Sequence, residues 1–139
     1  MSLQELRQRK LNEKRKIAEE FLAANQAKKG VVTTASGLQY LVITEGNGAK
    51  PTINDKVTVH YEGKLLNDTI FDSSVKRNKP ATFPLKNVIE GWQEGLQYMN
   101  EGAKFRFFIP SHLAYGELGA GPIGALETLI FEVELLSIN

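Results

Sequence analysis

Residues 56–66, KVTVHYEGKLL, alternate apolar and polar side chains. Val57, Val59 and Tyr61 fall on one face of an extended chain, and polar residues occupy the other face. A period of two is typical of a β-strand that packs one face on a core and leaves the other in solvent. We therefore predict a half-buried strand here, and a strand of this kind requires partners elsewhere in the chain.

Those partners are found on both sides of a single helical stretch. Further strands are predicted at residues 37–46, 81–85, 104–110 and 127–138, and residues 67–74 are interpreted as a polar turn followed by a short apolar pair. Pro84 cannot donate a ladder hydrogen bond, so its segment is expected at a sheet edge or a bend. The glycine-rich residues 114–125 predict a mobile loop. Strands joined by short turns around one helix indicate an α+β fold with an antiparallel sheet.

The helical stretch, VIEGWQEGL at residues 88–96, contains the only tryptophan. Val88, Trp92 and Leu96 recur at helical spacing. Glycines at positions 91 and 95 weaken such a helix by roughly 1 kcal/mol each relative to alanine. We expect the helix to lie so close to a curved sheet that side chains at these two positions would hold it off.

Residues 1–29 differ from the rest of the chain in charge. They contain eight Lys or Arg against four Glu, a net charge of +4, whereas residues 30–139 have nine against twelve, a net charge of −3. No glycine or proline interrupts the segment before Gly30, so we predict a charged helical arm over 1–29 and a globular domain over 30–139. The arm is interpreted as a solvated helix or as a helix that pairs with a partner. Interleaved acidic residues argue against nucleic-acid binding.

The composition excludes several kinds of chemistry. The chain has no cysteine and only two histidines, which argues against thiol catalysis and against a zinc site. No nucleophile elbow, metalloprotease motif or phosphate-binding loop is present. No apolar run approaches the roughly 20 residues of a membrane span, so we expect no membrane insertion. We expect neither a metal nor a cofactor.

Aromatic residues next to predicted turns are the remaining candidates for a site. Each one is a plausible core residue, but together they could line a concave apolar pocket for a small molecule or a peptide. Asp72 and Arg77 lie near them and are either a surface ion pair or part of that pocket. The aromatic residues are Tyr61, Phe71, Phe83, Trp92, Tyr115 and Phe131.

Five blocks of sequence, in this order, resemble the FKBP-type peptidyl-prolyl cis-trans isomerases. They are VTVHYEGKL, IFDSS…RNKPATFPL, VIEGWQEGLQYM, PSHLAYG and ETLIFEVELLSI. The resemblance runs from about Gly37 to Asn139. The charged helix that leads into GVV…SGLQY is similar to the bacterial macrophage-infectivity-potentiator branch. In that branch a long helix joins a dimerisation region to the isomerase domain, and residues 1–29 would be the distal part of that helix.

The resemblance implies a bent antiparallel sheet wrapped around one short helix, with a proline pocket between them. It implies catalytic roles for Tyr61, Asp72 and Tyr115. Asp72 would accept a hydrogen bond from Tyr61 and pair with Arg77, while the Ile89 N–H and the Tyr115 hydroxyl would bind substrate carbonyls. The residues implied to bind substrate are Phe71, Arg77, Phe83, Val88, Ile89, Trp92 as the pocket floor, Ile123 and Phe131.

The resemblance also implies an activity and its partners. The activity is isomerisation of X-Pro bonds in unfolded or partly folded polypeptides, and the alternative is a proline-binding chaperone module with little catalysis. Macrolides of the rapamycin type are expected inhibitors, and the bacterial cell envelope or periplasm is the expected location, with the cytoplasm as the alternative. A full-length protein would form a homodimer through its dimerisation region, whereas we expect this chain to be monomeric. Gly124 and Ala125 depart from the family pattern and are expected to loosen the loop over the site.

Overall fold

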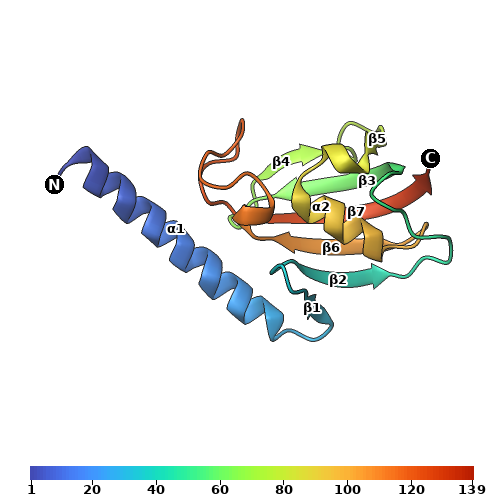
Figure 1. Cartoon of the computed structure of the whole chain (residues 1–139), viewed down its shortest axis with the longest axis horizontal. Helices are drawn as coiled ribbons and strands as arrows, with labels where there is room; N and C mark the ends of the chain where they lie inside the picture. The colour runs from blue at the N-terminus through green and yellow to red at the C-terminus, as the bar shows by residue number, and fades with distance from the viewer.

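The computed structural model describes all 139 residues, and its centre is a seven-stranded antiparallel sheet that curves around a short helix (Figure 1). The predicted α+β fold is confirmed. The strand order is β1-β2-β6-β7-β3-β4, and β5 pairs with β3. The elements are α1 (Leu3–Gln26), β1 (Val31–Thr33), β2 (Gln39–Thr44), β3 (Lys56–Lys64), β4 (Ile70–Ser73), β5 (Ala81–Pro84), η1 (Leu85–Asn87), α2 (Glu90–Gly95), η2 (Leu96–Tyr98), β6 (Lys104–Ile109), η3 (Ser111–Leu113) and β7 (Leu129–Ile138).

Strand β3 organises the sheet. It pairs with β7 along one edge, while its other edge is shared by β5 and β4. Val57, Val59 and Tyr61 are buried and alternate with partly exposed residues, as the period of two predicts. Pro84 lies at the last position of β5, which pairs only with β3, so the segment forms the short edge strand expected of it. On the buried face of β3, Tyr61 contacts Trp92 of α2, with ring centroids 5.2 Å apart.

The short helix α2 lies very close to β6. A methyl group at position 91 would lie 2.6 Å from Cγ2 of Ile109, and one at position 95 would lie 2.5 Å from Cε1 of Phe107. Carbon atoms do not approach within 3 Å without a shift of the backbone or the ring, so both positions need glycine. The expected reason for the two glycines is therefore confirmed. Because α2 lies this close to β6, the indole of Trp92, between the two glycines, lies directly beneath the sheet.

The N-terminal helix α1 is docked along its second half. Phe21 contacts Phe108 of β6 with ring centroids 6.1 Å apart. Asn25 is only 2% exposed and donates a 2.8 Å hydrogen bond to Gln39 Oε1, and Gln39 Nε2 donates to the carbonyl of Leu22. The fully solvated arm is thus a correct description only of the first turns, because this buried amide pair ties the end of the helix to β2.

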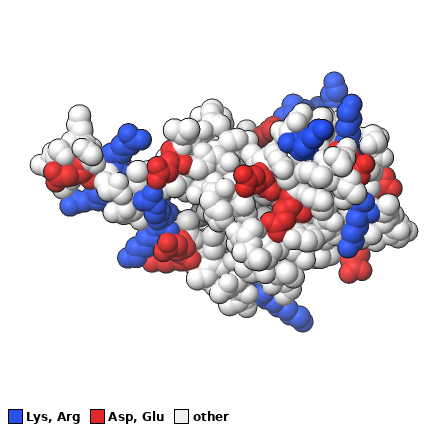
Figure 2. All heavy atoms as spheres, viewed as in Figure 1, with Lys and Arg blue, Asp and Glu red and all other residues white.

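Most charged side chains of α1 are exposed to solvent. Figure 2 shows basic and acidic ones interspersed along the helix. The helix ends at Gln26, and Gly30 adopts a φ of +86° in the turn that leads into β1. Strand β1 was not expected from the sequence, because three residues directly after a turn are too few to show a strand pattern. No helix combines the length and the apolar character that crossing a bilayer requires.

Candidate functional site

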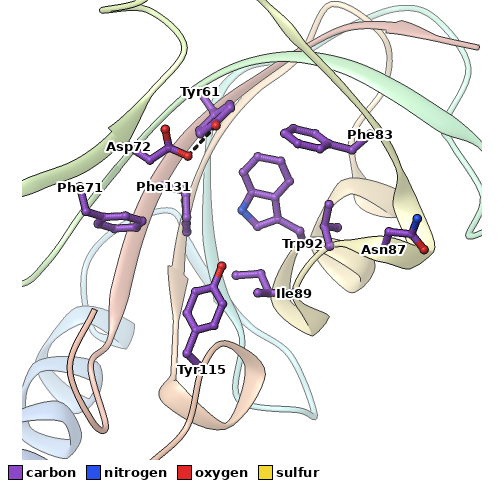
Figure 3. Close-up of a pocket in the computed structure, with 10 residues that line it drawn as sticks. Tyr61, Phe71, Asp72, Phe83, Asn87, Ile89, Trp92, Tyr115 and Phe131 are labelled. Atoms are coloured by element: carbon purple, nitrogen blue, oxygen red, sulfur yellow. Dashed lines mark hydrogen bonds between the residues drawn. The ribbon is translucent and has the colours of Figure 1, made fainter. Parts of the chain in front are cut away.

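A pocket of about 440 Å³ opens between α2 and the concave side of the sheet (Figure 3). Its walls come from β3, β4, β5 and β7, its base from α2, and one side from the segment after η3. Eight of its ten lining residues are hydrophobic, which suits an apolar ligand group. The lining residues are Tyr61, Phe71, Asp72, Phe83, Asn87, Val88, Ile89, Trp92, Tyr115 and Phe131.

The indole of Trp92 forms the base of this pocket and is held by three rings. Tyr61 and Phe131 each lie 5.2 Å from it and Phe83 lies 5.8 Å away, all at interplanar angles between 82° and 85°. Edge-to-face contacts of this kind add about 0.5–1.5 kcal/mol each beyond the burial of area. The indole is 4% exposed, and its Nε1 has no hydrogen-bond acceptor within the protein. The surrounding rings therefore fix the orientation of the base without a polar anchor.

A hydrogen-bonded triad of Tyr61, Asp72 and Arg77 lies along one wall. The Tyr61 hydroxyl donates to Asp72 Oδ2 at 2.6 Å, and Arg77 donates to Asp72 Oδ1 at 2.5 Å and to the Tyr61 hydroxyl at 3.0 Å. The guanidinium carbon also lies 5.8 Å from the centroid of the Tyr61 ring. Both carboxylate oxygens are thus bonded, and the phenol is held with its ring in the wall and its hydroxyl turned away from the base.

The triad shifts the acidity of its members in opposite directions. Burial and the hydrogen bond to Asp72 raise the pKa of Tyr61 above its usual value of 10.0. Burial alone would raise the pKa of Asp72, but hydrogen bonds from Tyr61 and Arg77 outweigh it and lower that pKa below 3.8. Near neutral pH the phenol is therefore neutral and the carboxylate charged, so neither group is poised to exchange a proton.

Two donors at the pocket have no partner of their own. Ile89 precedes α2 as its N-terminal capping residue, and its backbone N–H donates to no acceptor in the protein. Tyr115 follows η3 and is 39% exposed, and no hydrogen bond joins its hydroxyl to another pocket residue. Figure 3 shows the phenol rising beside Ile89 toward the pocket. The two free donors are available to the carbonyl groups of a bound chain.

The wall opposite Phe83 depends on a glycine that the sequence did not single out. Phe71 and Phe131 pack edge to face, with centroids 5.4 Å apart. A methyl group at Gly63 would lie 2.5 Å from Phe131 and 2.7 Å from Phe71. Gly63 pairs across the ladders with both Asp72 and Phe131, so it joins the two strands that carry the wall. A glycine inside an otherwise regular alternating strand was the available signal.

The residues predicted from the sequence fall into three groups. Nine of them line the pocket, as given above. Arg77 lies behind the wall and reaches the site through Tyr61 and Asp72. Ile123 is 7% exposed and belongs to the hydrophobic core, outside the pocket lining. Asn87 lines the pocket at the end of η1 and was missed, because a lone asparagine before a helix reads as an ordinary turn residue.

Fold and pocket together define a class: a small α+β domain with an aromatic pocket between one short helix and a curved antiparallel sheet. Residues 47–136 match the family model of the FKBP-type peptidyl-prolyl cis-trans isomerases, and residues 1–42 match the model of the domain amino-terminal to them. The chain belongs to the FKBP-type peptidyl-prolyl cis-trans isomerase family, and relatives named Mip and FkpA place it in the macrophage-infectivity-potentiator-like branch.

Individual relatives agree with this assignment. The FKBP-type peptidyl-prolyl cis-trans isomerase FkpA of Aeromonas hydrophila is 60% identical over 127 residues, which are 91% of this chain and 47% of the relative. The outer membrane protein MIP of Legionella longbeachae is 48% identical over 132 residues, or 94% of this chain and 57% of the relative. The crystal structure of FkpA from Escherichia coli superposes with a TM-score of 0.93 at 37% identity, covering 98% of this chain and 64% of that one. The chain thus spans about half the length of these curated relatives.

Proposed function

We propose that this chain catalyses cis-trans isomerisation of X-Pro bonds by binding the proline ring in the aromatic pocket. One observation carries the proposal. An apolar pocket with an indole base has two unpaired hydrogen-bond donors beside it, the Ile89 N–H and the Tyr115 hydroxyl. A proline residue matches this arrangement, because its ring is apolar while the carbonyls on either side of it need donors.

The reaction needs no bond-breaking group. Rotation about a peptide bond meets a barrier of about 18–20 kcal/mol that arises from amide resonance. The planar amide is more polar than the twisted form, since resonance places negative charge on its oxygen. A pocket walled by aromatic rings therefore favours the twisted amide relative to water. Each 1.4 kcal/mol of such differential stabilisation is worth about a factor of ten in rate.

Each part of the site has a place in this scheme. Trp92 supports the ring from below, and Phe83, Phe131 and Tyr61 surround it. The Ile89 N–H and the Tyr115 hydroxyl hold the flanking chain so that the imide bond is free to turn. Asp72 holds the Tyr61 phenol and contributes its charge at the wall, with no proton transfer assigned to it.

The apolar, aromatic character of the pocket also indicates which ligands it binds. Substrates are proline-containing segments of unfolded or partly folded proteins, and rapamycin-type macrolides are expected to compete for the site. The name of the Legionella relative supports a location in the bacterial cell envelope. The full-length protein would form a homodimer through a region that precedes α1, while residues 1–139 alone are expected to sediment as a monomer.

A matched pair of tyrosine variants tests the proposal. Tyr115→Phe removes the hydroxyl that binds a substrate carbonyl, and Tyr98→Phe removes one that bonds Glu94 on the surface instead. In a protease-coupled assay with an X-Pro peptide, the first variant should lose about 3- to 10-fold in kcat/KM, as expected for one hydrogen bond. The second should match the parent protein. Equal activity of both variants, or an inactive parent, would contradict the proposal.

A further inference from the structure

The segment that carries Tyr115 touches the N-terminal helix. We call residues 114–127 the Tyr115 loop. Its base is closed by a 2.8 Å hydrogen bond from the Leu126 N–H to the Gly116 carbonyl, and its tip by reciprocal 2.9 Å bonds between Ala120 and Ile123. These bonds shape the loop internally. Two contacts already attach the loop to the domain: the Gly116 N–H donates to the Ser111 carbonyl of η3 at 2.9 Å, and Ile123 is buried in the hydrophobic core. Neither contact involves residues 124–127, where the chain returns from the loop to β7.

Lys14 of α1 provides that contact at the base of the loop. Its ammonium donates to the Ala125 carbonyl at 2.9 Å and pairs with Glu127 Oε1 at 3.1 Å. The same nitrogen would lie 3.2 Å from a methyl group at position 124, so it sits directly over this turn. Both acceptors lie more than 110 residues away from Lys14 in the sequence. Helix α1 thus binds the Tyr115 loop directly, through the ammonium of Lys14.

The residue between the two acceptors is strained. Leu126 adopts a φ of +54°, a left-handed conformation that a branched side chain rarely takes. Lys14 binds the residue before it through a carbonyl and the residue after it through a carboxylate. Such a conformation persists only where the surroundings impose it. The ammonium of Lys14 supplies two of the contacts that do so.

Arg15 makes a second connection near the other end of the loop. Its Nη2 lies 2.6 Å from Oε1 of Glu117, two residues after Tyr115. Gly116, Gly119 and Gly121 all have positive φ, a conformation that glycine adopts without strain. The two basic residues thus contact the loop on both sides of this glycine-rich part.

We propose that Lys14 and Arg15 are positioning residues that hold the Tyr115 loop against α1 and so fix the hydroxyl of Tyr115 at the pocket. We call these contacts of Lys14 and Arg15 with the Tyr115 loop the latch. Its effect on substrate rests on the proposed function, whereas the latch itself does not. The latch makes the helical arm part of the active domain. The loosening expected from Gly124 and Ala125 is offset, because the Ala125 carbonyl is the atom that Lys14 holds.

The test replaces the ammonium and keeps the stem of the side chain. Lys14→Met removes both contacts, and Lys16→Met is the matched control, since Lys16 lies on the same helix and faces only Glu20 at 4.0 Å. The arm should stay docked in both variants through Asn25 and Phe21. Thermal unfolding and circular dichroism verify that both variants are folded.

Two readouts separate the latch from the catalysis. Hydrogen exchange of the bonded loop amides, including those of Gly119, Ile123 and Leu126, should be about 3- to 10-fold faster in Lys14→Met and unchanged in Lys16→Met. KM for an X-Pro peptide should rise about threefold with kcat unchanged, because the Tyr115 hydrogen bond exists in both ground and transition states. Lys14→Arg, which can donate to both acceptors, should restore both values.

Salt provides an independent check on the unmodified protein. Raising the ionic strength from 0.1 to 1 M shortens the screening length from about 10 to 3 Å, so loop exchange should accelerate more in the parent than in Lys14→Met, which retains only the Arg15–Glu117 ion pair. Unchanged loop exchange in Lys14→Met overturns the latch, whatever the kinetics show. Faster exchange with an inactive parent protein would retain the latch and reject the proposed function instead.

Discussion

The hydroxyl of Tyr61 on β3 lies 2.6 Å from the carboxylate of Asp72 on the neighbouring strand β4, and Arg77 bonds to both groups. The bond fixes a phenol ring that is also a wall of the pocket and a neighbour of Trp92. One interaction therefore supports both the sheet and the site. Its two members should be energetically coupled.

Tyr61→Phe should lower the free energy of unfolding by about 1 kcal/mol, less than the roughly 1.5–3 kcal/mol usual for a hydrogen bond to a charged group, because the Asp72 side chain is 40% exposed. Asp72→Ala should cost more, because it also removes the carboxylate that pairs with Arg77. The double variant of Tyr61→Phe and Asp72→Ala should cost less than the sum of the two, since each single change breaks the same bond. Urea unfolding of the four proteins measures the coupling, and strictly additive effects would show that the bond contributes nothing.

The stability that Asp72 contributes should depend on pH in one direction. Its pKa is lowered in the folded protein, so the carboxylate stabilises the fold above the unfolded value of about 3.9 and stops doing so as the pH falls through the lower folded value. The difference in melting temperature between the parent and Asp72→Asn should be constant from pH 5 to 8 and shrink below pH 4. A difference that grows on acidification would contradict this sign.

Gly95→Ala should destabilise the protein by about 1–3 kcal/mol, because the new methyl group would lie 2.5 Å from the Phe107 ring. Helix propensity alone predicts the opposite, a gain of up to about 1 kcal/mol. The sign of the change in unfolding free energy therefore decides between close packing and propensity. A more stable variant would mean that α2 can lift from β6 at no cost.

Gly63→Ala should disturb the pocket as well as the fold. The added methyl group meets Phe131 and Phe71 at 2.5 and 2.7 Å, so the two rings must move apart. We expect a loss of about 1–3 kcal/mol in stability and weaker macrolide binding measured by calorimetry. Unaltered macrolide affinity would show that the Phe71–Phe131 wall is not part of the ligand site.

The sheet could be predicted from the sequence because its strand β3 buries only one face. Val57, Val59 and Tyr61 therefore alternate with polar residues, and that alternation is visible without a structure. The glycines of α2 were readable for a similar reason, as each breaks a strong local preference. The aromatic lining followed from the resemblance of sequence blocks, since burial alone does not separate a pocket ring from a core ring.

The remaining features arise from contacts between distant parts of the chain. Lys14 and Glu127 are 113 residues apart, and a lysine on a charged helix carries no sign of its partner. Asn25 looks like one more polar residue of the arm until its buried bond with Gln39 is seen. Asn87 likewise acquires a role only from what the fold places beside it.

Exchange spectroscopy of an X-Pro peptide tests the central claim most directly, because it follows cis-trans interconversion without a coupling protease. Uncatalysed exchange takes tens to hundreds of seconds. At micromolar concentrations the protein should bring the two proline signals into detectable exchange, and a rapamycin-type macrolide should abolish the effect. If the peptide signals show no exchange at any protein concentration while the pocket still binds the macrolide, the chain is a binding module and the proposed catalysis is wrong.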